Sequence, residues 1–159
     1  MNAPREPLSV VVGIVGAEGA KFTPSGEQEA RAIIRVLLSR PKSHLVSGGC
    51  HLGGVDIWAE EEAAKLGVGM TIFPPRVQRW EGYKERNLRI AEASDVVHCI
   101  AVARLSLDFN GPRFTFCYHC GTRRHIKSGG CWTVKRSRYG MLHVVANEEV
   151  QTFGERYGK

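Results

Sequence analysis

The sequence lacks an apolar run of the length that a membrane-spanning helix needs, about 18 residues. Its first residues also lack the apolar stretch and small-residue cleavage site of a signal peptide. There is no internal repeat and no low-complexity linker. These absences exclude an integral membrane protein and predict one domain over residues 1–159, located in the cytoplasm. We therefore expect the five cysteines to be reduced or metal-bound rather than paired in disulfides.

Acidic residues are scarce in the last third of the chain. Residues 1–100 carry 12 Lys and Arg and 12 Asp and Glu, so the whole formal net charge of +6 lies in residues 101–159. Residues 104–138 contain eight basic residues and a single acid, Asp108. Such a stretch favours an anionic partner, either a nucleotide or a nucleic acid. The alternative is a basic surface that only faces solvent.

Apolar, strand-like segments alternate with amphipathic, helix-like segments. Residues 8–15 are an almost unbroken apolar run, which is typical of a strand buried on both faces. This alternation predicts an α/β, Rossmann-like fold with a parallel five-stranded sheet, helices on both faces and the strand order 3-2-1-4-5. Ligands of such folds bind at the carboxyl ends of the strands, where the strand order reverses.

Caps, breakers and apolar spacing set the expected boundaries. We expect strands over residues 8–15, 44–47, 70–73, 96–102 and 141–146. We expect helices from Thr23-Pro24 or Ser25 to just before Pro41, over 55–66, over about 83–93, and from near Cys131. Residues 104–131 read as a long loop or zinc-knuckle insertion, and 147–159 as a short helix or a tail. Three loops should meet at the crevice: residues 16–21, 47–54 and the end of the long loop.

Two glycine pairs follow short polar runs and precede predicted helices. A glycine-rich turn at a helix N-terminus lets backbone N–H groups approach an anion, and the helix dipole favours negative charge there. Two such turns indicate a phosphorylated ligand held from two sides, whereas ordinary strand-to-helix turns are the alternative. The candidate ligand-binding residues of these loops are Gly16, Ser47, Gly48, Gly49, Gly53, Gly54, Ser128, Gly129, Gly130 and Thr133.

Charged residues beside these turns are candidates for chemistry. Asp56 and Glu60 are spaced to share one face of the second helix, where a carboxylate could hold ribose hydroxyls or act as a general base. Asp56 could equally serve only to stabilise the helix dipole. Arg86 and Asn87 follow on the third helix, and an arginine can grip phosphate bidentately or simply face solvent. An aromatic residue beside them, Trp80 or Tyr83, could stack on a base, but Trp80 is expected to pack within a loop.

Cysteine and histidine residues cluster in the long irregular stretch. Cys117, Cys120, His125 and Cys131 have the spacing C-x2-C-x4-H-x5-C, with His119 as a substitute ligand. Zinc takes four nitrogen or sulfur ligands in a tetrahedron, so these residues predict a structural zinc site that also staples the loop. The alternative is free cysteines beside chance histidines.

The other two cysteines, Cys50 and Cys99, have no comparable cluster of cysteines and histidines near them in the sequence. Cys99 lies inside an apolar strand and should belong to the core. Cys50 precedes His51, but neighbours in sequence rarely point at each other, so a nucleophilic Cys50 is poorly supported.

Four segments together resemble the SLOG superfamily of Rossmann-like nucleotide-binding domains. They are Val46-Ser47-Gly48-Gly49, the run from Gly53-Gly54-Val55-Asp56 to Glu60, Tyr83-Lys84-Glu85-Arg86-Asn87, and Ser128-Gly129-Gly130-Cys131-Trp132-Thr133. The resemblance covers about residues 8–146 and is nearest to uncharacterised prokaryotic or phage members. It implies a Rossmann-like fold with a nucleotide or nucleotide derivative at the paired glycine turns.

The resemblance does not carry an activity with it. In Lonely Guy phosphoribohydrolases of this superfamily a catalytic glutamate follows the second motif, but Val134 follows Thr133 here. We therefore expect a nucleotide-binding protein of the sensor or sequestering type. A nucleotide N-glycosidase using Asp56 or Glu60 is the alternative, and a single-stranded nucleic-acid binder using residues 104–138 is a third, since DNA-processing protein A relatives bind single strands. The sequence leaves a homo-oligomer open and predicts no membrane partner.

Overall fold

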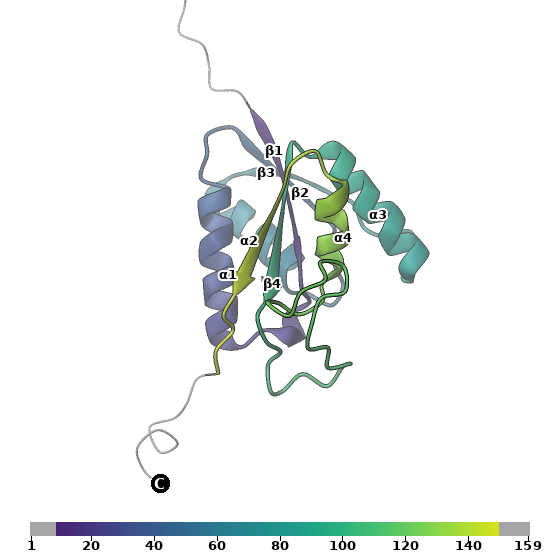
Figure 1. The fold of residues 1–159 in the computed structure, drawn as a ribbon. Helices are drawn as coiled ribbons and strands as arrows, with labels where there is room; N and C mark the ends of the chain where they lie inside the picture. Colours follow the sequence, from purple (N-terminus) through teal and green to yellow (C-terminus); the bar gives the residue numbers. More distant parts are fainter. Residues whose placement is uncertain (1–8, 150–159) are drawn as a thin grey trace, which may run out of the picture.

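The computed structural model describes residues 9–149 and contains one five-stranded, all-parallel sheet in the order β3-β2-β1-β4-β5 (Figure 1). The predicted fold class and strand order are confirmed. The strands are β1 (Val10–Gly16), β2 (Ser43–Ser47), β3 (Gly69–Ile72), β4 (Val96–Val102) and β5 (Gly140–Val145). The helices are α1 (Pro24–Leu37), α2 (Val55–Leu66), α3 (Trp80–Ala93) and α4 (Gly129–Arg136), with a short 3-10 turn at Gly19–Lys21.

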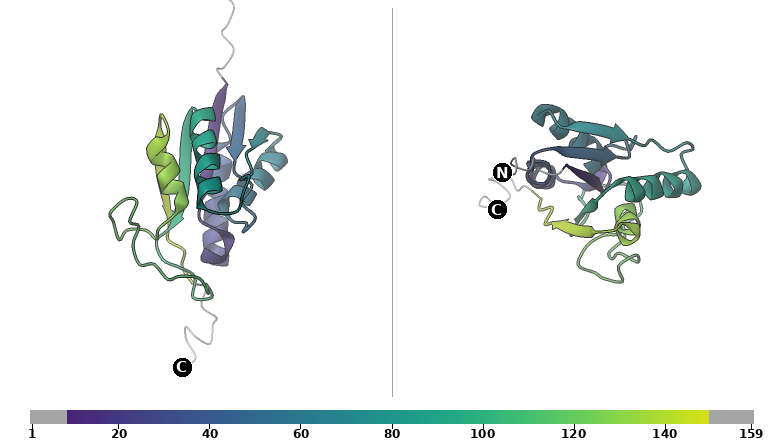
Figure 2. Two further views of the ribbon diagram at one scale, coloured as in Figure 1. Left: turned by 90° about the vertical axis from the view of Figure 1, so that its right-hand side faces the viewer. Right: turned by 90° about the horizontal axis from the view of Figure 1, so that it is seen from above.

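Helices cover both faces of the sheet (Figure 2). Alternate residues of β1 point to opposite sides, so Ile14 packs with Ala30 of α1 and Ala59 of α2, while Val15 packs with Ile90 of α3. The central strands are apolar on both faces because both faces are buried. The reversal of strand order falls between β1 and β4, which pair in parallel from Val12 opposite Val96 to Gly16 opposite Ile100.

The first helix begins as its sequence predicts. Thr23 is the N-cap, and its hydroxyl accepts a hydrogen bond of 3.0 Å from the Gly26 N–H, with Pro24 at the first helical position. The alternative start at Ser25 is therefore wrong. Asn147, just after β5, accepts from the Thr23 N–H at 2.8 Å and donates to the carbonyl oxygens of Lys21 and Arg104. The Asn147 amide therefore links the segment after β5 to the segment before α1 and to the loop after β4.

Two helix starts differ from the sequence prediction. Helix α3 begins at Trp80 rather than near Tyr83, so Trp80 lies on a helix and not in a loop. Helix α4 begins at Gly129, with Ser128 as the N-cap whose hydroxyl accepts from the Gly130 N–H at 3.2 Å. Both glycines of the second pair therefore belong to the helix itself. Glycine has a low intrinsic helix propensity, so the sequence alone predicts a later start. The Ser128 cap and the tertiary packing outweigh this low propensity.

The long segment between β4 and α4 has no regular element, as expected for residues 104–128, and lies below α4 in Figure 1. Buried apolar side chains and a backbone hydrogen bond anchor this segment to the sheet. Leu105, Phe109 and Ile126 are buried in the main core, and the Ile126 N–H donates to the Val102 carbonyl at 2.8 Å. Of the expected tail at 147–159, residues 147–149 carry no helix, and 150–159 lie outside the described residues.

Candidate ligand pocket and metal centre

A pocket of about 300 Å³ opens at the carboxyl end of β1, beside the point where the strand order reverses. The loop after β1, the loop before α2, the first turns of α3 and the start of α4 surround it. Its lining comprises Val15, Gly16, Ala17, Glu18, Lys21, Cys50, His51, Leu52, Asp56, Trp80, Tyr83, Arg86, Asn87, Lys127, Ser128, Gly129 and Gly130. The volume lies at the lower end of the range for small-molecule sites.

Three cations from three separate segments face this pocket: Lys21, Arg86 and Lys127. Burial lowers the pKa of Lys21, Glu18 raises it and Lys127 lowers it. The acidic residues Glu18 and Asp56 line the same pocket. The three cations together favour a negatively charged ligand there.

Arg86 is the buried member of the three and makes two side-chain hydrogen bonds. Its side chain is almost fully buried, its Nη1 donates to the Gly48 carbonyl at 2.7 Å, and its Nε donates to the Asn87 side-chain oxygen at 2.8 Å. Its Nη1 also lies 3.9 Å from an Asp56 carboxylate oxygen. Its Nη2 has no hydrogen-bond partner among residues 9–149, so the guanidinium keeps donors for a ligand.

Asp56, in the first turn of α2, is the buried carboxylate of the pocket. Burial raises its pKa to about 6, while Arg86 lowers it and Glu60 raises it. A carboxyl group that titrates near neutrality in a cleft can accept or donate a proton, as a general acid or base requires. Glu60 does not line this pocket, because its carboxylate accepts a 2.8 Å hydrogen bond from the Ser47 hydroxyl.

The start of α4 presents open backbone to the pocket. A Cβ added at Gly129 would meet no atom within 4 Å, so the space beside this residue is free. A Cβ at Gly130 would instead lie 2.7 Å from the Cys99 sulfur and 3.0 Å from Val15, so this glycine lets α4 pack against β1 and β4. The first N–H groups of a helix lack intrahelical partners and carry the positive end of its dipole, which suits an anion.

The glycines of the first pair have structural contacts instead. The Gly48 carbonyl binds Arg86, and a Cβ at Gly48 would lie 2.3 Å from the Arg86 Nη1. Gly54 caps α2 at a φ of +83° against the backbone of residues 17–19. The candidates that lie outside the pocket lining are Ser47, Gly48, Gly49, Gly53, Gly54, Glu60 and Thr133. From the 47–54 loop only Cys50, His51 and Leu52 line the pocket, so of the two glycine pairs only the one at α4 reaches it.

Sequence reasoning missed several pocket residues. Glu18 and Lys21 lie in the loop that was expected at the crevice, but no motif singled them out. Lys127 was counted only as part of the basic stretch, although it directly precedes the Ser128 cap. Tyr83, by contrast, is an aromatic residue that the sequence places beside Arg86 on the third helix. It lines the pocket, and the Arg86 guanidinium carbon is 5.6 Å from its ring centre.

The Cys50-His51 pair does not form a catalytic dyad. Both residues line the pocket, but the described part of the chain shows no contact between their side chains. Burial raises the pKa of the Cys50 thiol, which disfavours the reactive thiolate. Cys99 is fully buried in the core, as its place in an apolar strand predicts.

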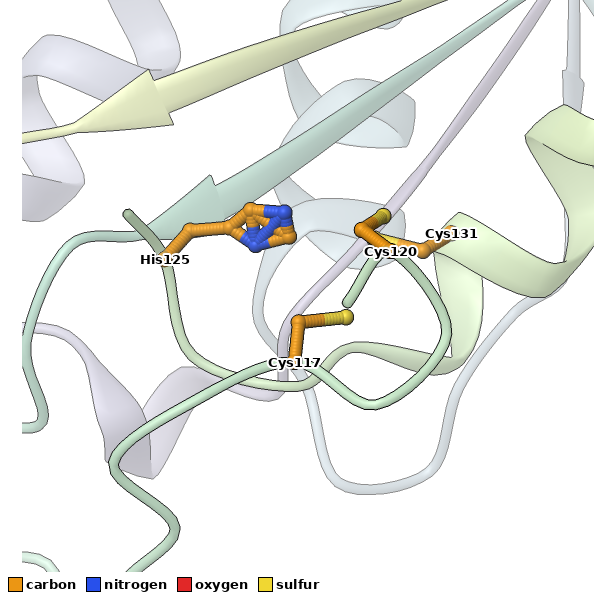
Figure 3. A group of neighbouring side chains, drawn as sticks. All are labelled: Cys117, Cys120, His125 and Cys131. Carbon is orange, nitrogen blue, oxygen red and sulfur yellow. The ribbon is translucent and has the colours of Figure 1, made fainter. Parts of the chain in front are cut away.

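The second site is a cluster of possible metal ligands beneath the start of α4. One ligand atom from each of Cys117, Cys120, His125 and Cys131 lies within 4.8 Å of the others, and their side chains point toward a common centre (Figure 3). These are the four residues predicted from spacing, and they could hold a metal ion. His119 is not part of the cluster, so it is not needed as a substitute ligand.

A tight turn brings the first two cysteines together. The Cys117 N–H donates to the Thr122 carbonyl at 2.8 Å, and the Cys117 carbonyl accepts from the Gly121 N–H at 2.9 Å. Gly121 has a φ of +65°, a conformation that other residues adopt at a cost. Cys120 is exposed, whereas the other three members of the cluster are buried.

One observation favours a cation at this cluster. Among residues 9–149, both ring nitrogens of His125 are buried and have no hydrogen-bond partner, which is costly for a polar group. Burial and the neighbouring Cys131 and Cys117 thiols raise the pKa of Cys120 to about 12, so its thiolate is disfavoured without a metal. A bound cation would reverse that preference and deprotonate the coordinating thiols.

Comparison with known proteins adds no assignment: no family model, curated protein or solved structure matches the chain. Among residues 9–149, no helix combines the length and apolar character needed to cross a membrane. In the basic stretch at 104–138, seven of the eight basic side chains are exposed and only Lys127 is partly buried.

Proposed function

We propose that the protein binds a nucleotide or nucleotide derivative in the pocket between β1 and β4, as a SLOG-type sensor or sequestering protein. The observation that carries this proposal is the convergence of Lys21, Arg86, Lys127 and the N-terminus of α4 on one small cavity. Each is a known kind of phosphate ligand, and they come from three separate parts of the chain: Lys21, the third helix with Arg86, and the segment from Lys127 into α4.

The remaining lining supplies groups for the rest of a nucleotide. Trp80 and Tyr83 offer aromatic rings on which a base can stack. Glu18 and Asp56 offer carboxylates that accept hydrogen bonds from ribose hydroxyls. In this arrangement the phosphate lies at Gly129, and Asp56 contacts the sugar.

Calorimetric titration with nucleoside mono- and diphosphates tests this proposal. We expect wild type to bind at least one of them, and Gly129→Val to abolish binding because the new side chain fills the space beside the helix N-terminus. Ser25→Val, in the first turn of α1, is the control for the same kind of change away from the pocket. Asp56→Ala should weaken nucleotides more than inorganic phosphate, since only nucleotides carry sugar hydroxyls. If wild type binds none of the panel, the proposal is wrong.

Cleavage of a nucleotide N-glycosidic bond is the second candidate function. The raised pKa of Asp56, the buried carboxyl group of the pocket, is the observation that favours it. An ionised Asp56 would orient or deprotonate the attacking water at the sugar carbon, and the base would leave with the bonding electron pair. Release of free base from nucleoside monophosphates by wild type, and its loss in Asp56→Asn, would establish the activity. Binding without base release would leave the sensor role.

We propose further that Cys117, Cys120, His125 and Cys131 hold one structural zinc ion. Three thiolates and one imidazole form a closed donor set of the kind that structural zinc sites use, with no position left for a reacting water. The two unpartnered His125 nitrogens support a bound metal, because coordination would satisfy one of them. Metal analysis of protein purified without chelator should find one zinc per chain. Protein without zinc, or with another metal at that ratio, would refute the assignment.

A further inference from the structure

A second cavity, of about 490 Å³, adjoins the first on the side of the metal cluster. It is lined by Trp80, Tyr118, His119, Lys127, Gly129 and Trp132. Trp80, Lys127 and Gly129 line both cavities, so the two spaces share one border. The residues that line only the second cavity are Tyr118 and His119 of the long loop and Trp132 of α4. The ribbon in Figure 1 shows that loop next to the lower end of α4.

Aromatic rings make up most of this second wall. Trp80 and Tyr118 are each about half exposed, so both rings have surface free for a ligand. Trp132 is buried, stands edge-on to Trp80 at 5.6 Å, and is covered by the Arg136 guanidinium at 3.6 Å from the ring centre. The remaining open rings are therefore those of Trp80 and Tyr118.

Positive charge lies between the two cavities. The Lys127 ammonium is 5.6 Å from the centre of the Tyr118 ring, and Lys127 also lines the first cavity. Gly129, the first residue of α4, stands at the same border with open space beside it. An anion placed there would have an aromatic chamber on either side, with Tyr83 in the first and Tyr118 in the second.

We infer that the two cavities bind one ligand, a dinucleotide whose linking phosphate lies at Gly129 and Lys127 and whose two bases occupy separate cavities. This inference rests on the proposed nucleotide-binding function and names its ligand class. A mononucleotide would fill the first cavity and leave the Tyr118 wall unused. A second base stacked on an aromatic ring adds affinity in proportion to that stacking.

The metal cluster positions two residues that line the second cavity. Tyr118 and His119 are the two residues between the ligands Cys117 and Cys120, in the tight turn that the hydrogen bonds of Cys117 close. A metal ion bound there fixes the backbone on both sides of Tyr118. The structural metal site is thereby a part of the ligand site.

The test compares ADP with diadenosine 5′,5′-diphosphate, which carries the same pyrophosphate and one further adenosine. Calorimetry on the full chain should give a dissociation constant for the dinucleotide at least about ten-fold below that for ADP, as expected for one added stacked base. Tyr118→Leu should bring the ratio of the two constants close to one. Tyr83→Leu should weaken the binding of both ligands. Tyr139→Leu alters an exposed ring away from both cavities and should change neither dissociation constant.

Each result separates this inference from the function on which it rests. If ADP binds and the dinucleotide binds no tighter, the dinucleotide site does not exist and the nucleotide pocket stands. If the dinucleotide binds tighter but Tyr118→Leu leaves the ratio unchanged, the second base does not lie in the second cavity and the inference is wrong. If neither ligand binds, this inference is wrong, and the proposed function is wrong as well if wild type binds no nucleotide of the calorimetric panel. Tighter binding of a ten-nucleotide DNA strand than of the dinucleotide would overturn the ligand class.

Discussion

Replacing one exposed cysteine distinguishes a metal centre from a chance cluster of thiols. Cys120 is the only exposed member of the group. Without a metal, Cys120→Ser is a surface substitution, and such changes shift stability by about 0.5 kcal/mol or less. With a metal, the same change removes one of four ligands whose binding energy contributes directly to folding. The loss of stability caused by Cys120→Ser should therefore be several-fold larger if a metal is bound than if none is.

The expected magnitude follows from what the cluster holds. Loss of the site leaves both nitrogens of His125 buried without partners and frees the turn that carries Cys117. Loss of a metal site belongs to the changes that cost on the order of 4 kcal/mol. At about 2–4 °C per kcal/mol for a chain of this size, the melting temperature should fall by roughly 8–16 °C.

Thermal unfolding followed by circular dichroism measures this change, with the metal content of each sample determined in parallel. Cys50→Ser is the matched control, because Cys50 has the same chemistry, is only partly buried and lies outside the cluster. We expect the control to retain its metal and to melt close to wild type. A wild-type protein without metal, together with a Cys120→Ser variant that melts within about 1 °C of it, would refute the metal centre.

Three further substitutions test the electrostatics of the fold and of the pocket. Because burial raises the pKa of Asp56 to about 6 from 3.8, its stabilising contribution is complete below pH 3.8 and is lost as the pH rises through 6. Asp56→Asn should therefore gain stability relative to wild type between pH 4 and pH 7, by on the order of 3 kcal/mol in urea unfolding, and a constant difference would contradict the shift. Glu62 is buried and bonded to three cations, with hydrogen bonds to Arg35 first among the causes that lower its pKa to about 2, so its contribution is present above pH 4.5 and lost as the pH falls through 2. Glu62→Gln should cost about 2 kcal/mol at pH 7 and Glu61→Gln, at an exposed position, much less, whereas equal costs would show that the buried charge is unimportant. Arg86→Lys should weaken ADP binding by more than about ten-fold, because lysine cannot reproduce the forked contacts of a guanidinium, while the control Arg89→Lys should leave it unchanged. An unchanged ADP affinity in Arg86→Lys would show that Arg86 does not bind the ligand.

The order of the sheet was predictable because it follows from local signals. Apolar runs such as residues 96–102 and caps such as Thr23 lie within a few residues of the boundaries they set. Right-handed crossovers then leave few ways to arrange five parallel strands. The metal cluster was predictable for the same reason, since three of its four residues lie within nine positions of one another and a turn at Gly121 brings the first pair together.

The pocket was predictable only in part, because its walls meet through tertiary packing. The glycines of the first pair fitted a phosphate turn, but Gly48 uses its carbonyl to hold Arg86, a contact across 38 positions in sequence. Nothing near Lys21 or Lys127 in the sequence shows that both residues line one pocket. Glu60 had the right spacing from Asp56, yet the neighbouring Ser47 hydroxyl binds it away from the pocket.

The crystal structure of the protein with ADP tests the central claim most directly. The account predicts a phosphate group beside Gly129, at the N-terminus of α4, with the Arg86 guanidinium and the Lys127 ammonium within hydrogen-bonding or ion-pair distance of its oxygens. It also predicts the ribose next to Asp56. Phosphate bound at the 47–54 loop instead, or no ADP in the pocket of a crystal grown at saturating ligand, would contradict the account.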